Sequence, residues 1–402
     1  MFSASLLGHI ALFITGLLCL IVNSGYSYGP IMLALMGLWA WRQRPSLHDS
    51  SSTLFAAIVV FAVGQASLAL GWGEGWRRAE TYLQFLFIIP LIWAVVRLRL
   101  DATYWFVGVA LGAMLTVSWS LWQRVVLGVE RAGGHTYVIQ HGDIGMLMGF
   151  TSLMGALYFR GRRGWMVLML VGAVSGLLVS ILSGTRGGWV GLPVVGWMAW
   201  RAFSPELKRG VRLGVYSIVF FASALMLTVP ATGVPSRIGH AVEELARLQQ
   251  GDYSGESVVP RLMMWQMGLG LILDKPILGW GAEAFEAERD RQIQAGETRL
   301  TIPTNHLHNE LIDIAVKHGL VGAALLLWLY WSSAAVFRRD LGEKSVQVRA
   351  LATSGLLLVL LYIDFGLSQT MFYRNSGRVV FIAWLGITYG LWLNERRKAH
   401  AG

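Results

Sequence analysis

Long apolar runs separated by short polar segments fill most of this chain. A helix needs about 20 apolar residues to cross a bilayer, so each run is a candidate membrane span. We predict twelve spans, at residues 5–22, 29–42, 53–71, 80–97, 103–122, 142–159, 165–182, 187–203, 211–230, 307–337, 348–370 and 377–394. The expected fold is an all-α polytopic membrane protein, with a single integral membrane domain over residues 1–402.

The composition supports the same class. Hydrophobic residues make up 55% of the chain and charged residues only 14%, whereas soluble globular domains carry about 25% charged residues. The segment 1–5 contains no basic residue, so no cleaved signal peptide is predicted and the first span stays in the protein. The single cysteine, Cys19, excludes an internal disulfide and a cysteine cluster for a metal.

The basic residues predict the orientation of the spans. More than half of the 33 Lys and Arg residues fall in the loops on the side that holds both termini, together with few of the 23 acids. By the positive-inside rule this side is the cytoplasm. The loop 231–305, between the ninth and tenth spans, is then expected outside, in the periplasm of a Gram-negative host. The net charge of +10 is therefore a signal of orientation and gives no evidence for nucleic-acid binding.

The loop 231–305 contains helical patterns. Residues 238–248 place apolar side chains at helical spacing, which predicts an amphipathic helix. Pro260 stands where a second helix would begin and Pro276 where it would end. This second helix is apolar but too short to cross, so we place it against the membrane surface or as a re-entrant piece. The charged run 283–299 is expected to be a solvated cap.

Two arginines near membrane boundaries are candidate phosphate ligands, because the guanidinium is a permanently charged, planar donor. Arg186 lies in the glycine-rich turn 182–189 between two spans, where small residues allow a ligand to approach the backbone. Arg261 follows Pro260 in the first turn of a helix, where its charge opposes the helix dipole. A bound anion would compensate that charge. The alternatives are an ordinary interfacial arginine at 186 and pairing of Arg261 with Glu256.

Two histidines stand where the polar loop returns to apolar sequence. The imidazole of His306 or His308 can take a proton near neutral pH, and the helix dipole at the start of a span favours its neutral form. A structural interfacial histidine is the alternative. Their spacing could also suit a metal on a strand, but no third ligand follows at a recognised spacing. Asp364, in the outer half of a span, needs a partner, which could be His308, Arg186 or Arg261.

The order of these motifs resembles the O-antigen ligase and polymerase superfamily. The resemblance rests on Ser183–Trp189 (SGTRGGW), on Arg261 in the long loop, on the run from Pro276 to Phe285 and on His308–Asn309. It covers about residues 140–390. Twelve spans in a chain of this length look most like the ligase branch, and the implied fold is similar to that of the GT-C glycosyltransferases.

The resemblance implies an inverting, metal-independent glycosyltransferase without a cofactor, in the bacterial inner membrane. The donor would be an O-antigen polysaccharide on undecaprenyl pyrophosphate, and the acceptor would be lipid A–core. His308 would deprotonate the acceptor hydroxyl, and Arg186 and Arg261 would bind the donor pyrophosphate. His306, Asn309 and Asp364 are the expected supporting residues. Because both substrates are lipids, the site is expected to open sideways to the bilayer under the loop 231–305.

Three other functions stay open from the sequence. An O-antigen polymerase would share the loop and the arginines but use a second lipid-linked glycan as the acceptor. A protein O-oligosaccharyltransferase would use a Ser or Thr side chain. A transporter or flippase would instead place charges within the spans or repeat interrupted helices in both halves, and neither feature is clear here. The sequence does not indicate the oligomeric state.

Overall fold

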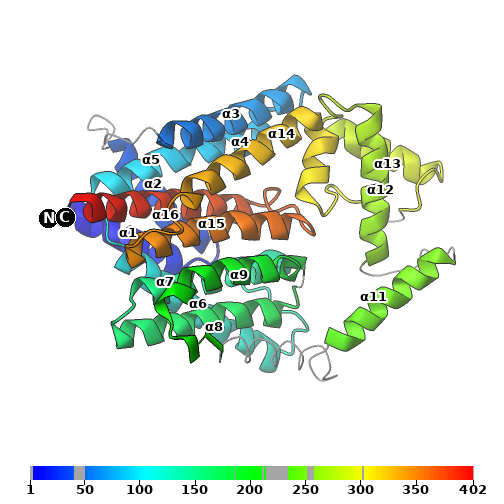
Figure 1. Ribbon diagram of the computed structural model, residues 1–402. Coiled ribbons are helices and arrows are strands. Elements are labelled where there is room, and N and C mark those ends of the chain that lie inside the picture. The colour runs from blue at the N-terminus through cyan, green and yellow to red at the C-terminus, as the bar shows by residue number, and fades with distance from the viewer. Residues whose placement is uncertain are drawn as a thin grey trace.

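The computed structural model describes residues 3–39, 50–185, 187–210, 212–213, 234–250, 258–300 and 303–401. Within these ranges every regular element is a helix (Figure 1). The α-helices are α1 (Ala4–Leu17), α2 (Gly25–Trp39), α3 (Ser50–Gly71), α4 (Trp76–Leu83), α5 (Ile88–Arg97), α6 (Ala102–Val125), α7 (Val138–Tyr158), α8 (Arg163–Ser183), α9 (Leu192–Phe203), α11 (Val234–Gln249), α12 (Val258–Asp274), α13 (Ala282–Gln294), α14 (Glu310–Arg338), α15 (Val346–Gly366) and α16 (Asn375–Ala401).

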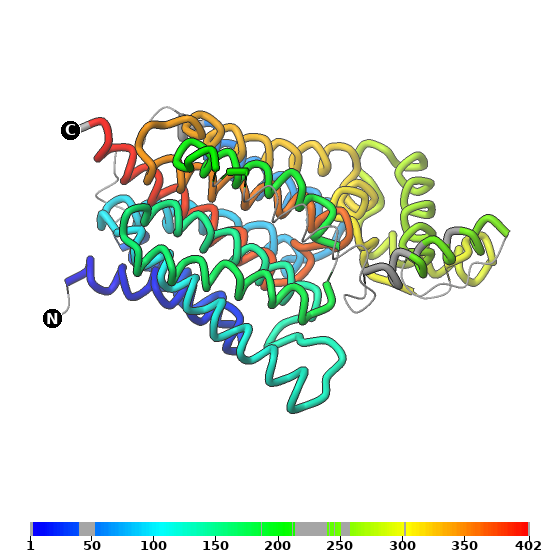
Figure 2. The backbone as a smooth tube through the Cα atoms, turned by 60° about the horizontal axis from the view of Figure 1, so that its bottom comes forward, coloured from blue at the N-terminus to red at the C-terminus, as the bar shows by residue number. Residues whose placement is uncertain are grey.

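Most of these helices form one elongated bundle, and α11, α12 and α13 lie beyond one of its ends (Figures 1 and 2). Both chain termini lie at the opposite end. In the bundle α7 packs against α8, α1 against α6, and α14 against α3 and α15. The expectation that both termini share one side and the long loop the other agrees with this arrangement. We call the end that carries α11–α13 the outer end.

Seven segments in the described part of the chain are long and apolar enough to cross a membrane, which confirms a multi-pass membrane protein. They are α3, the run α4–α5, α6, α8, α14, α15 and α16. The run α4–α5 is continuous over Trp76–Arg97 because a short 3-10 turn, Gln84–Phe87, joins the two helices.

Four of the other five expected spans do not meet that criterion, and the fifth is not tested. The span expected at 5–22 is the 14-residue helix α1, and the one at 29–42 is the 15-residue helix α2. At 142–159, α7 has the length of a span but buries the polar residues Gln140, His141 and Asp143 at its outer end. At 187–203, α9 has only 12 residues. The span expected at 211–230 lies almost wholly outside the described residues.

The helices of the long loop follow the expected pattern. The amphipathic helix expected at 238–248 is α11, and α12 contains Pro260 in its first turn and ends at Asp274, shortly before Pro276. The charged run 283–299 is not wholly solvated, because α13 buries Phe285 and Arg289. Phe285 packs in a small apolar core with residues of α12, of α14 and of the segment that joins α13 to α14.

The turn after α12 wedges into a break in α14. Gly319 has a φ of 65° inside α14, and the backbone around it bonds to the turn: Leu320 N donates to Pro276 O at 2.8 Å and Trp280 N to Val316 O at 2.9 Å. A Cβ on Gly319 would lie 2.1 Å from Ile277 O. The paired glycines of the 276–281 segment, which in the sequence predict only a tight loop, therefore join α12 to the first half of α14.

Candidate functional site

The segment 303–309 brings both candidate histidines to the outer end of the bundle, just before α14. The His306 and His308 rings lie with their centroids 4.4 Å apart, and both side chains are half-buried. His306 also stacks on Tyr373, from the α15–α16 connection, at 4.8 Å between ring centroids. His308 has a φ of 49°, in the left-handed region that few residues other than glycine adopt. Strained conformations of this kind persist where the surrounding structure holds them.

A buried ion pair at the start of α14 holds this segment. Asp313 Oδ1 accepts a hydrogen bond from the Leu307 N–H at 3.0 Å. Lys317 Nζ donates to Asp313 Oδ2 at 2.8 Å and to the Asn305 carbonyl at 2.9 Å. Trp265 of α12 donates from Nε1 to the Leu307 carbonyl at 3.0 Å. The segment between the two histidines is therefore fixed from both α12 and α14.

A second anchor comes from α13. Arg289 is only 4% exposed, and its guanidinium donates to the Thr304 carbonyl and, at 3.2 Å, to Asn305 Oδ1. The only charged partner of Arg289 among the described residues is its neighbour Asp290, at 2.8 Å. Arg289 therefore acts on the backbone of the histidine segment, and α13 contributes to the shape of the site.

Asn309, the residue after His308, has a structural role. It is the N-cap of α14, and its Oδ1 accepts from Leu311 N and Ile312 N, each at 3.1 Å. Its amide donates to the Leu367 carbonyl at 3.3 Å. An N-cap of this type satisfies backbone N–H groups that the helix leaves free. Asn309 therefore fixes where α14 begins relative to the end of α15, and with it the position of His308.

The surroundings of His308 favour its neutral form. Burial lowers the pKa of His308, and the nearby charge of Arg261, with a smaller effect from Arg374, lowers it further, while the side chain of Gln369 opposes the shift. Burial and the neighbouring His308 lower the pKa of His306 to about 4. Nδ1 of His308 is buried without a hydrogen-bond partner among the described residues. A neutral imidazole with a free nitrogen can accept a proton.

Arg261 and Arg374 lie near His308, and Arg131 lies near Arg261. Arg261, half-buried in the first turn of α12, is close enough to His308 and to Arg131 that their charges interact, and burial followed by Arg131 lowers the pKa of Arg261. Arg374 packs over the ring of Tyr137 at 3.9 Å, and its Nε is buried without a hydrogen-bond partner among the described residues. The cationic groups far outnumber the acids here, so the site favours an anion.

Arg131 links this group to the glycine-rich turn. Its Nε donates to the Ser183 carbonyl at 2.9 Å, and Thr185 Oγ1 donates to the Val138 carbonyl at 3.3 Å, so the turn packs against the start of α7. Arg186 itself lies outside the described residues, and its expected role stays a prediction. Arg131 and Arg374 were missed by the sequence analysis, although both lie in loops on the predicted outer side.

Asp364 does not contact His308. Its Oδ1 accepts a hydrogen bond from Gly191 N at 2.6 Å, at the start of α9, and Gly191 packs directly against the carboxyl group. The structure thus places Asp364 at the connection between the glycine-rich turn and α9. No role in orienting His308 follows from this geometry. Among the described residues no group of three or more His, Cys, Asp or Glu side chains lies together as metal ligands would.

Comparisons with known proteins agree with the resemblance. Residues 171–327 match the family model described as O-Antigen ligase. An uncharacterized protein of Haemophilus influenzae is 24% identical over 371 residues, which cover 90% of this chain and 93% of that protein. An O-antigen ligase of Escherichia coli is 25% identical over 264 residues, which cover 65% of this chain and 58% of that protein. The chain is thus a multi-pass helical membrane protein with a segment that matches the O-antigen ligase family model.

Proposed function

We propose that this protein is a glycosyltransferase that joins O-antigen polysaccharide from undecaprenyl pyrophosphate to lipid A–core. The observation that carries the proposal is the half-buried His308, kept neutral beside Arg261 and Arg374 at the outer end of the bundle. A neutral base next to a cluster of fixed cations suits a reaction in which a hydroxyl is deprotonated and an anion leaves. The outer end would face the periplasm.

The proposed step uses these groups in order. His308 takes the proton of the acceptor hydroxyl while the hydroxyl oxygen forms a bond to the anomeric carbon of the donor sugar. The bond from that carbon to the pyrophosphate oxygen breaks on the opposite face, and the configuration is inverted. Arg261 and Arg374, with Arg131 and Arg186, bind the pyrophosphate that leaves. Guanidinium groups then supply the charge neutralisation that a divalent cation supplies in many other transferases.

The helices beyond the bundle, α11 to α13, are proposed to cover the site as a lid. They bring Arg261, Arg289 and Trp265 to the histidine segment. Deletion of residues 238–248, in the amphipathic helix α11, should lower transfer while leaving the protein in the membrane. Full activity of a deletion variant present at the normal level would contradict the lid.

Complementation tests the function directly. A host that makes O-antigen but lacks its own ligase would receive the wild-type protein, His308→Ala, or the control His400→Ala, which changes an exposed histidine in the last turn of α16. We expect wild type and the control to restore long-chain lipopolysaccharide on a gel. His308→Ala should leave unsubstituted lipid A–core and accumulate long undecaprenyl-linked chains.

Two other results would point elsewhere. In a host that lacks its polymerase, restored chain length would indicate an O-antigen polymerase. A normal lipopolysaccharide ladder from His308→Ala would mean that His308 is structural and that the proposed chemistry is wrong. Modification of membrane or periplasmic proteins in place of lipid A–core would indicate a protein O-oligosaccharyltransferase.

A further inference from the structure

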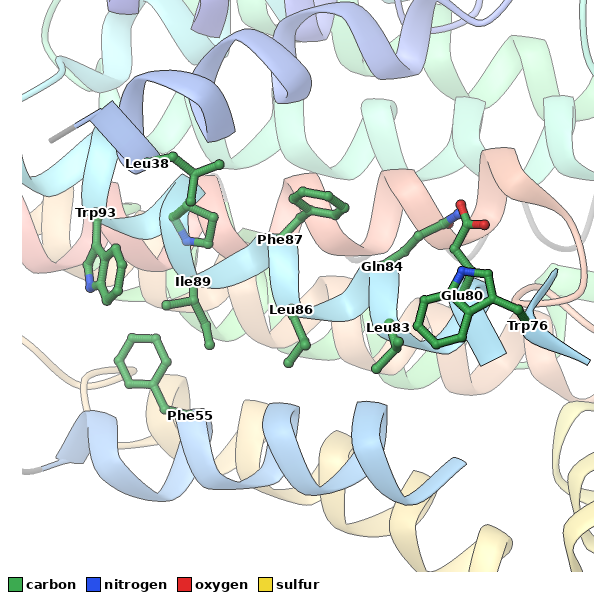
Figure 3. A pocket seen from close by; sticks show the side chains of 11 residues that line it. Leu38, Phe55, Trp76, Glu80, Leu83, Gln84, Leu86, Phe87, Ile89 and Trp93 are labelled. Atoms are coloured by element: carbon green, nitrogen blue, oxygen red, sulfur yellow. The ribbon is translucent and has the colours of Figure 1, made fainter. Parts of the chain in front are cut away.

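A groove lies along the continuous segment α4–α5, Trp76–Arg97. It has a volume of about 750 Å³, and α2 and α3 flank it (Figure 3). A second hollow of about 390 Å³, between α2 and α16, shares Leu38, Glu80, Gln84 and Phe87 with the first. The two hollows are therefore adjoining, and we call them together the α4–α5 groove.

The groove has the length and lining of a site for one hydrocarbon chain. It extends from Trp76 to Trp93, which at 1.5 Å per residue is about 25 Å along the helix. The hydrocarbon core of a bilayer is about 30 Å thick. Phe55, Leu38 and Trp93 line its inner end, where Figure 3 shows them around one space. Hollows of several hundred cubic ångströms are the usual size for a small-molecule ligand.

The polar groups of the groove gather at its outer end. Glu80 and Gln84 line both hollows, and Ser27 and Asn375 join them in the second. The Glu80 side chain is exposed, and within the described part of the chain no ion pair or hydrogen bond reaches it. Gln84 Oε1 accepts from Arg378 Nε at 3.3 Å, which leaves the Gln84 amide N–H groups for another partner. The outer end thus offers one negative charge and neutral donors, among them the Gln84 amide.

We propose that the α4–α5 groove binds one acyl chain of a phospholipid whose head group carries a protonated primary amine. The ammonium pairs with Glu80, and the head-group phosphate accepts a hydrogen bond from the Gln84 amide. The apolar lining takes the chain. An isoprenyl pyrophosphate does not fit this end, because its two phosphates would meet the Glu80 carboxylate. The lining contains no Lys or Arg, and Arg378 behind Gln84 already donates to Gln84 and to the Phe372 and Tyr373 carbonyls.

One residue, Arg378, connects the outer end of the groove to the histidine segment. Arg378, which holds Gln84, also donates from Nη1 to the Phe372 and Tyr373 carbonyls at 2.7 and 3.0 Å. Tyr373 stacks on His306. A lipid that orders Gln84 and Arg378 would therefore also brace the backbone beneath His306. This role is additional to the proposed transfer reaction and does not depend on it.

Photo-crosslinking tests the proposal without any activity assay. The full-length protein in nanodiscs would be labelled with phosphatidylethanolamine that carries a photoreactive acyl chain, and in parallel with phosphatidylglycerol that carries the same chain. Peptide mapping would locate the label. We expect label on groove peptides that contain Leu38 or Phe87, roughly two- to fivefold stronger for the amine lipid, which is the range of one partly exposed ion pair.

Variants of Glu80, a control variant and a modified lipid distinguish an effect of the Glu80 charge from a failure to fold. Glu80→Gln should remove the preference between the two lipids, and Glu80→Lys should reverse it, whereas Glu130→Gln, at an exposed acid in the α6–α7 loop, should leave it unchanged. Acetylation of the lipid amine should remove the preference of the wild-type protein. This test needs no protein variant, so it still applies if a Glu80 variant fails to fold.

Three outcomes would overturn the proposal. Equal groove labelling by both lipids on the wild-type protein would mean ordinary annular lipid. Label spread evenly over all the spans would mean that the groove is not a site. Displacement of the amine lipid by undecaprenyl pyrophosphate would assign the groove to the isoprenyl donor.

Discussion

Lys317 and Asp313, one turn apart on α14 and both 6% exposed, form an ion pair with 2.8 Å between Nζ and Oδ2. Each of them also holds the backbone of the histidine segment, Lys317 through the Asn305 carbonyl and Asp313 through the Leu307 N–H. The position of His308 is therefore set by a charged pair that does not belong to the group Arg261, Arg374 and Arg131, which we call the arginine cluster.

The pair predicts separate effects on stability and on transfer. Removing one member of a buried ion pair costs about 3–5 kcal/mol, whereas replacing both by apolar residues is often close to neutral. Asp313→Leu and Lys317→Met should each lower the melting temperature strongly, and the double variant should lose less than either alone. All three should lose transfer, because the histidine segment loses its anchors.

The exposed pair Arg291–Glu297, at the end of α13, is the control, and its removal should change neither property. A double variant with normal transfer would show that the ion pair does not position the histidines.

The break in α14 predicts a large cost for a methyl group at Gly319. An added Cβ would meet backbone atoms of the 276–281 turn, and the positive φ is unfavourable for alanine. Gly319→Ala should destabilise the protein by more than about 1 kcal/mol. Gly270→Ala, at a helical glycine of α12 with open space around it, should be neutral or slightly stabilising. Thermal unfolding in detergent measures both, and equal melting temperatures would contradict the wedged turn.

The lowered pKa of His306 predicts a loss of stability in acid. The ordinary histidine pKa is about 6.5, and in the fold the pKa of His306 is about 4. Between these values the unfolded state binds more protons than the folded state, so stability falls as the pH falls from about 6.5 towards 4. His306→Gln should reduce the difference between the melting temperatures at pH 7 and pH 5. The exposed His240→Ala should leave that difference as it is in the wild type.

The arginine cluster predicts a ranked loss of anion binding. A hydrogen bond to a charged group contributes about 1.5–3 kcal/mol, so Arg261→Ala and Arg374→Ala should each weaken inorganic pyrophosphate binding roughly tenfold or more. Arg131→Ala should have a smaller effect, because its guanidinium also bonds to Ser183 and is exposed. Arg124→Ala, at the exposed end of α6, is the control. Calorimetry on the purified protein would show this order, and equal affinity throughout would place the anion elsewhere.

Local patterns in the sequence predicted the helices of the long loop well. Apolar spacing and the positions of Pro260 and Pro276 are short-range signals, and they are enough to place α11 and α12. The number of spans was less predictable, because hydropathy alone does not separate a crossing helix from a shorter apolar one such as α1 or α9.

The candidate site could not be predicted from local sequence patterns alone. Only the family resemblance suggested that Arg261 and His308 act together. The local sequence at either position did not. Arg131 and Arg374 lie in separate loops, and only the packing of the helices brings Arg374 near His308 and Arg131 near Arg261. Asp364 shows the reverse case: a lone carboxylate in a span suggested a catalytic partner, and its partner is the backbone N–H of Gly191.

The most direct test of the central claim is the transfer rate of purified His308→Ala with purified donor and acceptor, measured at saturating concentrations of both. General base catalysis contributes about 10²- to 10⁴-fold. We predict a loss of rate in that range, with donor affinity close to that of the wild type and with His400→Ala, at the C-terminal end of α16, at the wild-type rate. An unchanged rate for His308→Ala would contradict His308 as the base.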